Sequence, residues 1–97
     1  MATYISLLKY TQKGVEAIKD SPKRLDAGKE VFKKLGGELK QFYLVMGQYD
    51  IVVVAEAPNE EAVTKAILSI GSKGNVQSTT FRAFSEAEFR KIISELP

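Results

Sequence analysis

The sequence contains neither cysteine nor histidine. Without cysteine, the chain can form no disulfide, thiolate nucleophile, iron–sulfur cluster or zinc–thiolate site. Without histidine, it lacks the usual proton shuttle near neutral pH, the commonest transition-metal ligand, and the base of Ser-His and Cys-His nucleophile pairs. Any catalysis would have to rely on carboxylates, Lys, Arg, Tyr and hydroxyl groups. We therefore expect no catalytic signature, no cofactor and no metal site.

Long apolar runs are also missing, and the N-terminus does not read as a charged and then apolar signal segment. The length of 97 residues, with 44% hydrophobic and 27% charged residues, predicts one globular domain over residues 1–97 and a cytoplasmic location. The net charge is +2, and the lysines of the N-terminal half alternate with acids. That pattern is typical of a solvated helix surface rather than of a basic nucleic-acid stripe. We expect neither a nucleic acid nor a membrane as a partner.

The predicted elements follow the order β-α-β-β-α-β-α. Alternating apolar residues predict strands, and a helical period predicts helices; the strands span 3–10, 38–46, 49–57 and 75–84, and the helices span 20–37, 58–74 and 85–96. Ser21 is expected to cap the first long helix, and Ser85 with Glu88 to form a capping box on the last. Two β-α-β crossovers that share a hairpin predict an α+β, ferredoxin-like fold with an extra C-terminal helix and the antiparallel sheet order 4-1-3-2.

The central hairpin predicts that the sheet has two apolar faces. If Gly47 and Gln48 form a two-residue turn, Met46 pairs with Tyr49 and Val45 pairs with Asp50. One face is then fully apolar and is expected to lie under the helices; it carries Phe42, Leu44, Met46, Tyr49, Ile51, Val53 and Ala55. The other face carries an apolar block of Tyr43, Val45, Val52 and Val54. Because helices cover only one side in this topology, we expect the second face to pack on another copy of the chain.

Asp50 is a carboxylate at the end of an otherwise apolar sheet face. Neighbouring strand residues point to opposite faces, so Tyr49 and Asp50 cannot act together on one substrate. The favoured interpretation is that Asp50 accepts hydrogen bonds from backbone amides of the turn or of the loop after the first strand. A role in ligand binding or proton transfer is the alternative.

Three blocks of the chain resemble the GYD family, a set of small proteins without an established activity. They are "TYISLLKYTQKGVEAIKDSPKRLDA", "FYLVMGQYDIVVVAEAP" and "GSKGNVQSTTFRAFSEAEF", and the name-giving residues stand here as Gly47, Tyr49 and Asp50. Gln48 separates the first two, which departs from the literal tripeptide. The resemblance implies a single GYD-like domain with the ferredoxin-like fold of the dimeric α+β barrels.

A binding site is predicted at one end of the sheet, where the first strand ends and the third begins. The candidate ligand-binding residues, which would hold a small anionic or aromatic molecule, are Tyr10, Lys13, Arg24, Tyr43, Tyr49 and Asp50. Arg24 lies in the first turn of a helix and would be the natural partner of an anion. The first hypothesis is therefore a homo-oligomeric small-molecule-binding or regulatory module.

The second hypothesis is a cofactor-independent enzyme of the dimeric-barrel kind, such as a monooxygenase or an isomerase. In such an enzyme Asp50 would act as the general base and Tyr43 as a donor or ring platform. Arg82 could hold an oxyanion on the fourth strand, but it should lie at the far end, where an ion pair with Glu56 is the simpler expectation.

Overall fold

A computed structural model describes residues 1–97. It contains a four-stranded sheet, four α-helices and one short 3₁₀-helix, η1 (Ile18–Asp20). In chain order the other elements are β1 (Ala2–Tyr10), α1 (Gln12–Glu16), α2 (Ser21–Lys34), β2 (Glu38–Leu44), β3 (Ile51–Ala57), α3 (Glu60–Gly71), β4 (Val76–Ala83) and α4 (Glu86–Ser94).

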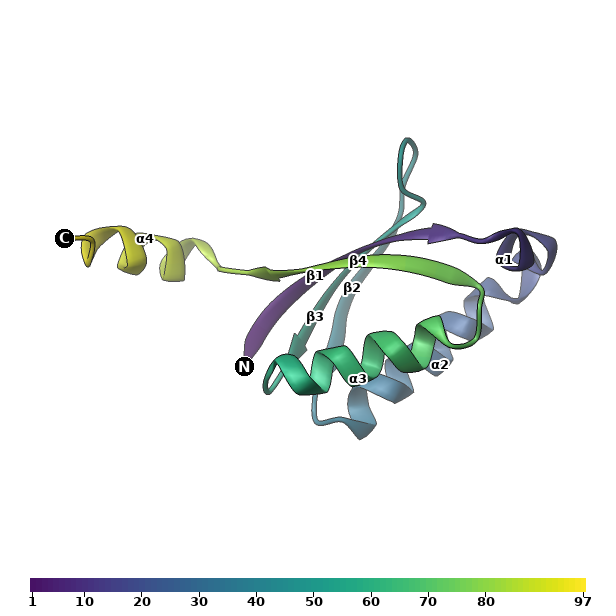
Figure 1. The fold of residues 1–97 in the computed structure, drawn as a ribbon, viewed down its shortest axis with the longest axis horizontal. Helices are drawn as coiled ribbons and strands as arrows, with labels where there is room; N and C mark the ends of the chain where they lie inside the picture. Colours follow the sequence, from purple (N-terminus) through teal and green to yellow (C-terminus); the bar gives the residue numbers. More distant parts are fainter.

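The sheet is antiparallel throughout, with the strand order β2-β3-β1-β4. This is the predicted order 4-1-3-2 counted from the other edge. Helices α2 and α3 lie together on one side of the sheet (Figure 1). The predicted ferredoxin-like topology and its additional C-terminal helix are therefore confirmed.

The ends of the helices follow local chemistry. The α2 helix ends where Gly36 takes φ 81°, so that the Gly37 N–H can donate to the carbonyl oxygen of Phe32 over 2.9 Å. The predicted capping box of α4 is present, with Ser85 and Glu88 each accepting from the other's backbone N–H. The expectation that Ser21 caps α2 is wrong. Because η1 runs directly into α2, Ser21 is already helical and Asp20 occupies the N-cap position without a side-chain bond.

The core lies between the helices and the facing side of the sheet. Its nine buried apolar residues are Tyr4, Leu8, Phe32, Ile51, Val53, Ala55, Ala57, Val63 and Ala66. Along β1 and β3 the buried residues alternate with less buried ones, as expected when only one face of a strand is covered by helices. The buried residues of β3 include Ile51, Val53 and Ala55, which the hairpin pattern placed under the helices.

The β2–β3 hairpin has the predicted register but not the predicted tight turn. Tyr43 lies opposite Val52, and the Val45 N–H donates to the Asp50 carbonyl oxygen over 2.8 Å. No backbone bond joins residues 46 and 49, so residues 45–50 form a longer loop. This loop projects from the sheet on the side away from α2 and α3 (Figure 1). For that reason Leu44 and Met46, expected under the helices, are instead 71% and 97% exposed.

The second face of the sheet has no helix over it. We define the open sheet face by its apolar side chains, none of which is buried: Ile5, Leu7, Tyr43, Val45, Val52, Val54 and Phe81. Tyr43 and Phe81 are about half exposed, at 52% and 49%. A sheet face exposed to water normally carries polar residues, so these seven side chains form an unusual surface.

The α4 helix extends away from the rest of the molecule (Figure 1). The chain measures 51 Å along its longest axis but only 17 Å along its shortest. Every residue from 84 to 97 is exposed. These include the apolar side chains Phe89, Ile92, Ile93 and Leu96. The apolar stripe of α4 is therefore not covered by its own chain.

Candidate functional site

At the end of the sheet where a binding site was predicted, Asp50 connects the start of β3 to the end of β1. The Asp50 carboxylate accepts a hydrogen bond from the Tyr10 backbone N–H over 2.9 Å. The Asp50 N–H in turn donates to the Leu8 carbonyl oxygen over 2.9 Å. The donor belongs to Tyr10, the last residue of β1, next to the loop from which a donor was expected. This carboxylate therefore joins the end of β1 to the start of β3.

The loop after α3 lies against the segment that follows β1. The Thr11 hydroxyl donates to the Gly74 carbonyl oxygen over 2.6 Å, and the Lys13 ammonium donates to that of Lys73 over 2.8 Å. The chain approaches so closely here that a Cβ at Gly14 would overlap the carbonyl oxygen of Asn75. The polar groups of this region mostly hold backbone segments together.

The Arg24 side chain is also hydrogen-bonded to backbone carbonyl groups. Its guanidinium donates to the carbonyl oxygens of Ala17, over 2.9 Å, and Gly14, over 3.2 Å. The Tyr10 hydroxyl and the Ser21 hydroxyl are 2.7 Å apart and share a hydrogen bond. Together these contacts attach the start of α2 to α1 and to the end of β1.

An apolar cleft lies between α2, α3 and the covered face of the sheet. Its volume is about 350 Å³. The apolar residues that line it include Leu8, Val31, Phe32, Phe42, Val53 and Ile70. Asp20, Lys23 and Lys73 also line the cleft, and all three are exposed, which places them at its rim. The cleft thus has an apolar interior and a charged mouth.

The six predicted binding residues do not converge on this cleft. Tyr10 and Arg24 line it, whereas the other four do not. Tyr43 lies on the open sheet face, and Tyr49 and Asp50 belong to the hairpin loop. Ligand binding by these residues stays a prediction.

Sequence reasoning missed the cleft, although one signal for it was present. Gly28 stands in the middle of the apolar stripe of α2, where a larger residue would normally fill the core. Outside the backbone of its own helix, a Cβ at this position would have a single neighbour within 4 Å, the Cδ1 atom of Ile70 at 3.7 Å. The glycine thus marks space between the two helices.

A smaller pocket, of about 290 Å³, lies between α3 and β4 above Tyr4. The Tyr4 hydroxyl is buried and has no hydrogen-bond partner. Burial raises the pKa of this phenol above its ordinary value of 10.0, and the Glu60 carboxylate raises it further, while Arg82 lowers it. The ring of Tyr4 has the Arg82 guanidinium 5.9 Å from its centroid. A buried hydroxyl without a hydrogen-bond partner lowers the stability of the fold.

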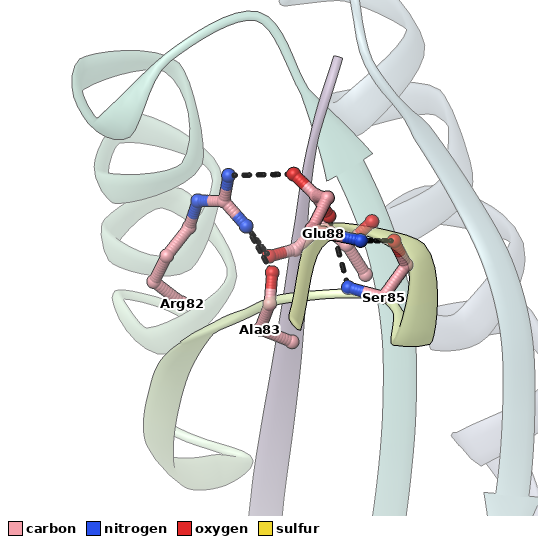
Figure 2. Close-up of polar contacts among 5 residues, drawn as sticks. Arg82, Ala83, Ser85 and Glu88 are labelled. Atoms are coloured by element: carbon pink, nitrogen blue, oxygen red, sulfur yellow. Dashed lines mark hydrogen bonds and ion pairs between the residues drawn. The ribbon is translucent and has the colours of Figure 1, made fainter. Parts of the chain in front are cut away.

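Arg82 connects this pocket to the start of α4. Its guanidinium lies 3.6 Å from the Glu88 carboxylate, donates to the Ala83 carbonyl oxygen, and sits 4.4 Å from the centroid of the Phe84 ring. Figure 2 shows these polar contacts beside the capping box of α4. The expected ion pair with Glu56 is wrong, because Arg82 shares the helix-covered face with Tyr4, whereas Glu56 points to the other side. Arg82 thus helps to set the direction in which α4 leaves the sheet.

Neither pocket has the ligands of a metal centre. No group of three or more Asp or Glu side chains is close enough to hold a cation. None of the helices combines the length and the apolar character that crossing a bilayer requires. The polar residues that line the two pockets are Tyr, Arg, Lys, Ser, Thr, Asn and a single carboxylate in each pocket.

Solved structures with a similar fold include regulatory proteins. The feast or famine regulatory protein of M. tuberculosis, complexed with L-methionine, superposes with a TM-score of 0.67 and 15% identity. The match covers 88% of this chain and 51% of that one, so the present chain spans about half the length of that protein. FFRP-DM1 matches with a TM-score of 0.62 and 21% identity over 87% of this chain and 100% of its own. The TM-scores show a shared fold.

Sequence comparison gives a more specific relationship. A protein of Thermus thermophilus named "Glutamine synthetase and cystathionine beta-lyase binding protein" is 33% identical over 89 residues. That match covers 91% of this chain and 94% of the relative. The model of the GYD domain family matches residues 4–93, and the chain therefore belongs to this family.

Proposed function

We propose that the protein is a homo-oligomeric regulatory module that binds a small molecule and a partner protein without catalysing a reaction. The observation that carries the proposal is the apolar cleft, whose exposed charged residues Asp20, Lys23 and Lys73 lie at the rim. Ligand sites are typically concave and mostly apolar, with a few polar groups that orient the ligand. A catalytic site would need an acid or a base beside the bound substrate.

The enzyme hypothesis receives less support from the position of Asp50. Its carboxylate accepts the Tyr10 N–H and does not line the cleft. Tyr43, the suggested donor, lies on the open sheet face, away from the cleft. No observation brings these two groups together around a common substrate.

A protein partner is suggested by the Thermus thermophilus relative. That relative is named for binding glutamine synthetase and cystathionine beta-lyase, and it matches nearly the full length of this chain. We therefore propose that this protein also binds a metabolic enzyme of one of these two kinds. The bound small molecule would alter that interaction by favouring one conformation of the module.

Self-association is supported by the apolar surfaces that the chain leaves uncovered. Only 12 of 97 residues are buried, which is few for a chain that must offset its loss of conformational entropy. The open sheet face and the apolar stripe of α4 are the surfaces that a second copy would cover. The α4 helix has nine residues, and isolated helices shorter than about 12–15 residues are marginal in water. We propose that both surfaces pack in the homo-oligomer.

The function is tested by measuring binding and turnover in the same samples. Glutamine synthetase and cystathionine beta-lyase from the same organism are immobilised, and the association of this protein is followed by biolayer interferometry. A metabolite library is screened by thermal shift, and each hit is incubated with the protein and examined by NMR. We expect association with at least one enzyme and a ligand that is recovered unchanged. Conversion of a hit into a product would overturn the proposal in favour of an enzyme.

A further inference from the structure

We propose that the apolar cleft binds a small amphipathic carboxylate, that is, a molecule with one carboxylate on an aliphatic or aromatic body. This inference rests on the proposed ligand-binding function and names the chemical class of the ligand. The body would lie between α2 and the sheet, and the carboxylate would lie at the rim.

The interior of the cleft favours an apolar body. Its volume of about 350 Å³ is at the lower end of the range for small-molecule sites, which is about 300–1,000 Å³. Phe32 and Val53 are buried core residues that also line it, and Phe42 packs beside them. An apolar lining of this kind gives water few partners, since an ordered water usually needs two to four hydrogen bonds. A hydrocarbon or aromatic body can fill this space without leaving a polar group unpaired.

The rim favours a negative charge. Lys23 and Lys73 are exposed there and form no ion pair, and Asp20 is the single acid among the lining residues. Arg24 adds a third positive charge, although its donors are directed at the carbonyl oxygens of Ala17 and Gly14. A carboxylate at the mouth would meet two free ammonium groups. An ammonium ligand would be repelled by the same groups.

The mouth is also held in place before any ligand arrives. The hydrogen bond between the Tyr10 and Ser21 hydroxyls joins β1 to the start of α2. The bonds from Thr11 to Gly74 and from Lys13 to Lys73 attach the loop that carries the second lysine. Because this frame is already formed, ligand binding does not have to pay the entropy of ordering it.

Binding is tested with three probes of the same chain length: decanoate, decanol and decylamine. Isothermal titration on the full chain should give the tightest binding for decanoate and the weakest for decylamine. In the Lys23→Glu, Lys73→Glu double variant, decanoate affinity should fall by about tenfold or more, while decanol affinity stays within about twofold. Equal binding of all three probes, or an unchanged decanoate affinity in the double variant, would overturn the carboxylate assignment while leaving the ligand-binding function intact.

The location is tested at Gly28, where the chain offers a matched pair of variants. Gly28→Leu places a side chain in the cleft and should abolish decanoate binding. Gly28→Ala also raises the helix propensity but leaves most of the cleft empty. The affinity of this variant for decanoate should therefore stay within about twofold of that of the unaltered protein. Circular dichroism checks that both variants fold. Retained binding in a folded Gly28→Leu protein would overturn the cleft as the site, whereas failure of every metabolite in the thermal-shift screen would overturn the proposed function itself.

Discussion

At the scale of single residues, the polar side chains at the end of the sheet already have backbone partners, and Asp50 is the clearest case. Its carboxylate accepts the Tyr10 N–H, so replacement by Asn keeps an acceptor of the same shape. We expect Asp50→Asn to lower the free energy of unfolding by about 1–2 kcal/mol, because the bond loses its charge. Asp50→Ala should cost more, since the Tyr10 donor is left unpaired. Denaturant titration at neutral pH measures both, and a gain in stability for Asp50→Asn would identify a functional carboxylate instead.

Tyr4 presents the opposite situation, a buried hydroxyl without a partner. Tyr4→Phe removes the unpaired group and keeps the ring, so the free energy of unfolding should rise by up to about 1 kcal/mol at neutral pH. Tyr43→Phe is the control, because Tyr43 is 52% exposed and its hydroxyl can reach water. A clear loss of stability in Tyr4→Phe, measured by denaturant titration, would mean that the hydroxyl has a partner in solution.

The same residue predicts a sensitivity to alkali. Burial raises the pKa of Tyr4 above 10.0, so the folded chain holds this proton more tightly than the unfolded chain does. The associated stability is complete below pH 10 and is lost as the pH rises through the folded-state pKa. Thermal melts above pH 10 should therefore show a decline that is smaller in Tyr4→Phe. Parallel declines in the two proteins would contradict this assignment.

At the scale of elements, the start of α4 depends on a charged capping box. The hydrogen bond from the Ser85 N–H lowers the pKa of Glu88 below 4.5, and Arg82 lowers it further. This stabilisation is present above about pH 4.5 and is lost as the pH falls through the lower, folded-state pKa. The amide resonances of α4 should therefore shift towards random-coil positions in acid, as followed by NMR. Glu88→Gln keeps a capping acceptor and should show a smaller change over the same range, whereas an identical titration would exclude Glu88 as the cause.

The elements could be predicted from the sequence because their signals are local. The hairpin pattern identified the covered face of β3, and Ser85 with Glu88 marked the start of α4. The wrong predictions concern how one element continues into or packs against another. Ser21 was misassigned because η1 runs directly into α2, so that Ser21 is already helical. Met46 was misassigned because it lies in a loop longer than the expected two-residue turn.

The candidate site could be predicted only in part, because it too depends on how the elements lie relative to one another. Strand order alone placed Asp50 beside Tyr10, and that contact is present. The cleft depends on the separation between α2 and the sheet, which no short stretch of sequence encodes. Arg82 was assigned to Glu56 because both lie at the same end of the sheet, but the two side chains point to opposite faces.

At the scale of the whole molecule, the uncovered surfaces predict how copies of the chain associate. The open sheet face is continuous across all four strands. In one row, Val52 of β3 lies between Leu7 of β1 and Tyr43 of β2. In the next row, Ile5 of β1 lies between Val54 of β3 and Phe81 of β4. Two such faces can pack against each other about a two-fold axis, because each contributes the same residues.

The central position of Val52 makes it the point at which this association can be broken. The unaltered protein should be a dimer or larger at micromolar concentration, as measured by light scattering after size exclusion. Val52→Lys should weaken association by about a hundredfold or more, because it places a charge inside an apolar contact that offers it no partner. Leu68→Lys is the matched control, since Leu68 is an exposed apolar residue of α3 on the helical side of the molecule and should leave the oligomer intact. A monomeric unaltered protein, or equal effects of the two lysines, would show that the open sheet face is not the surface through which the copies pair.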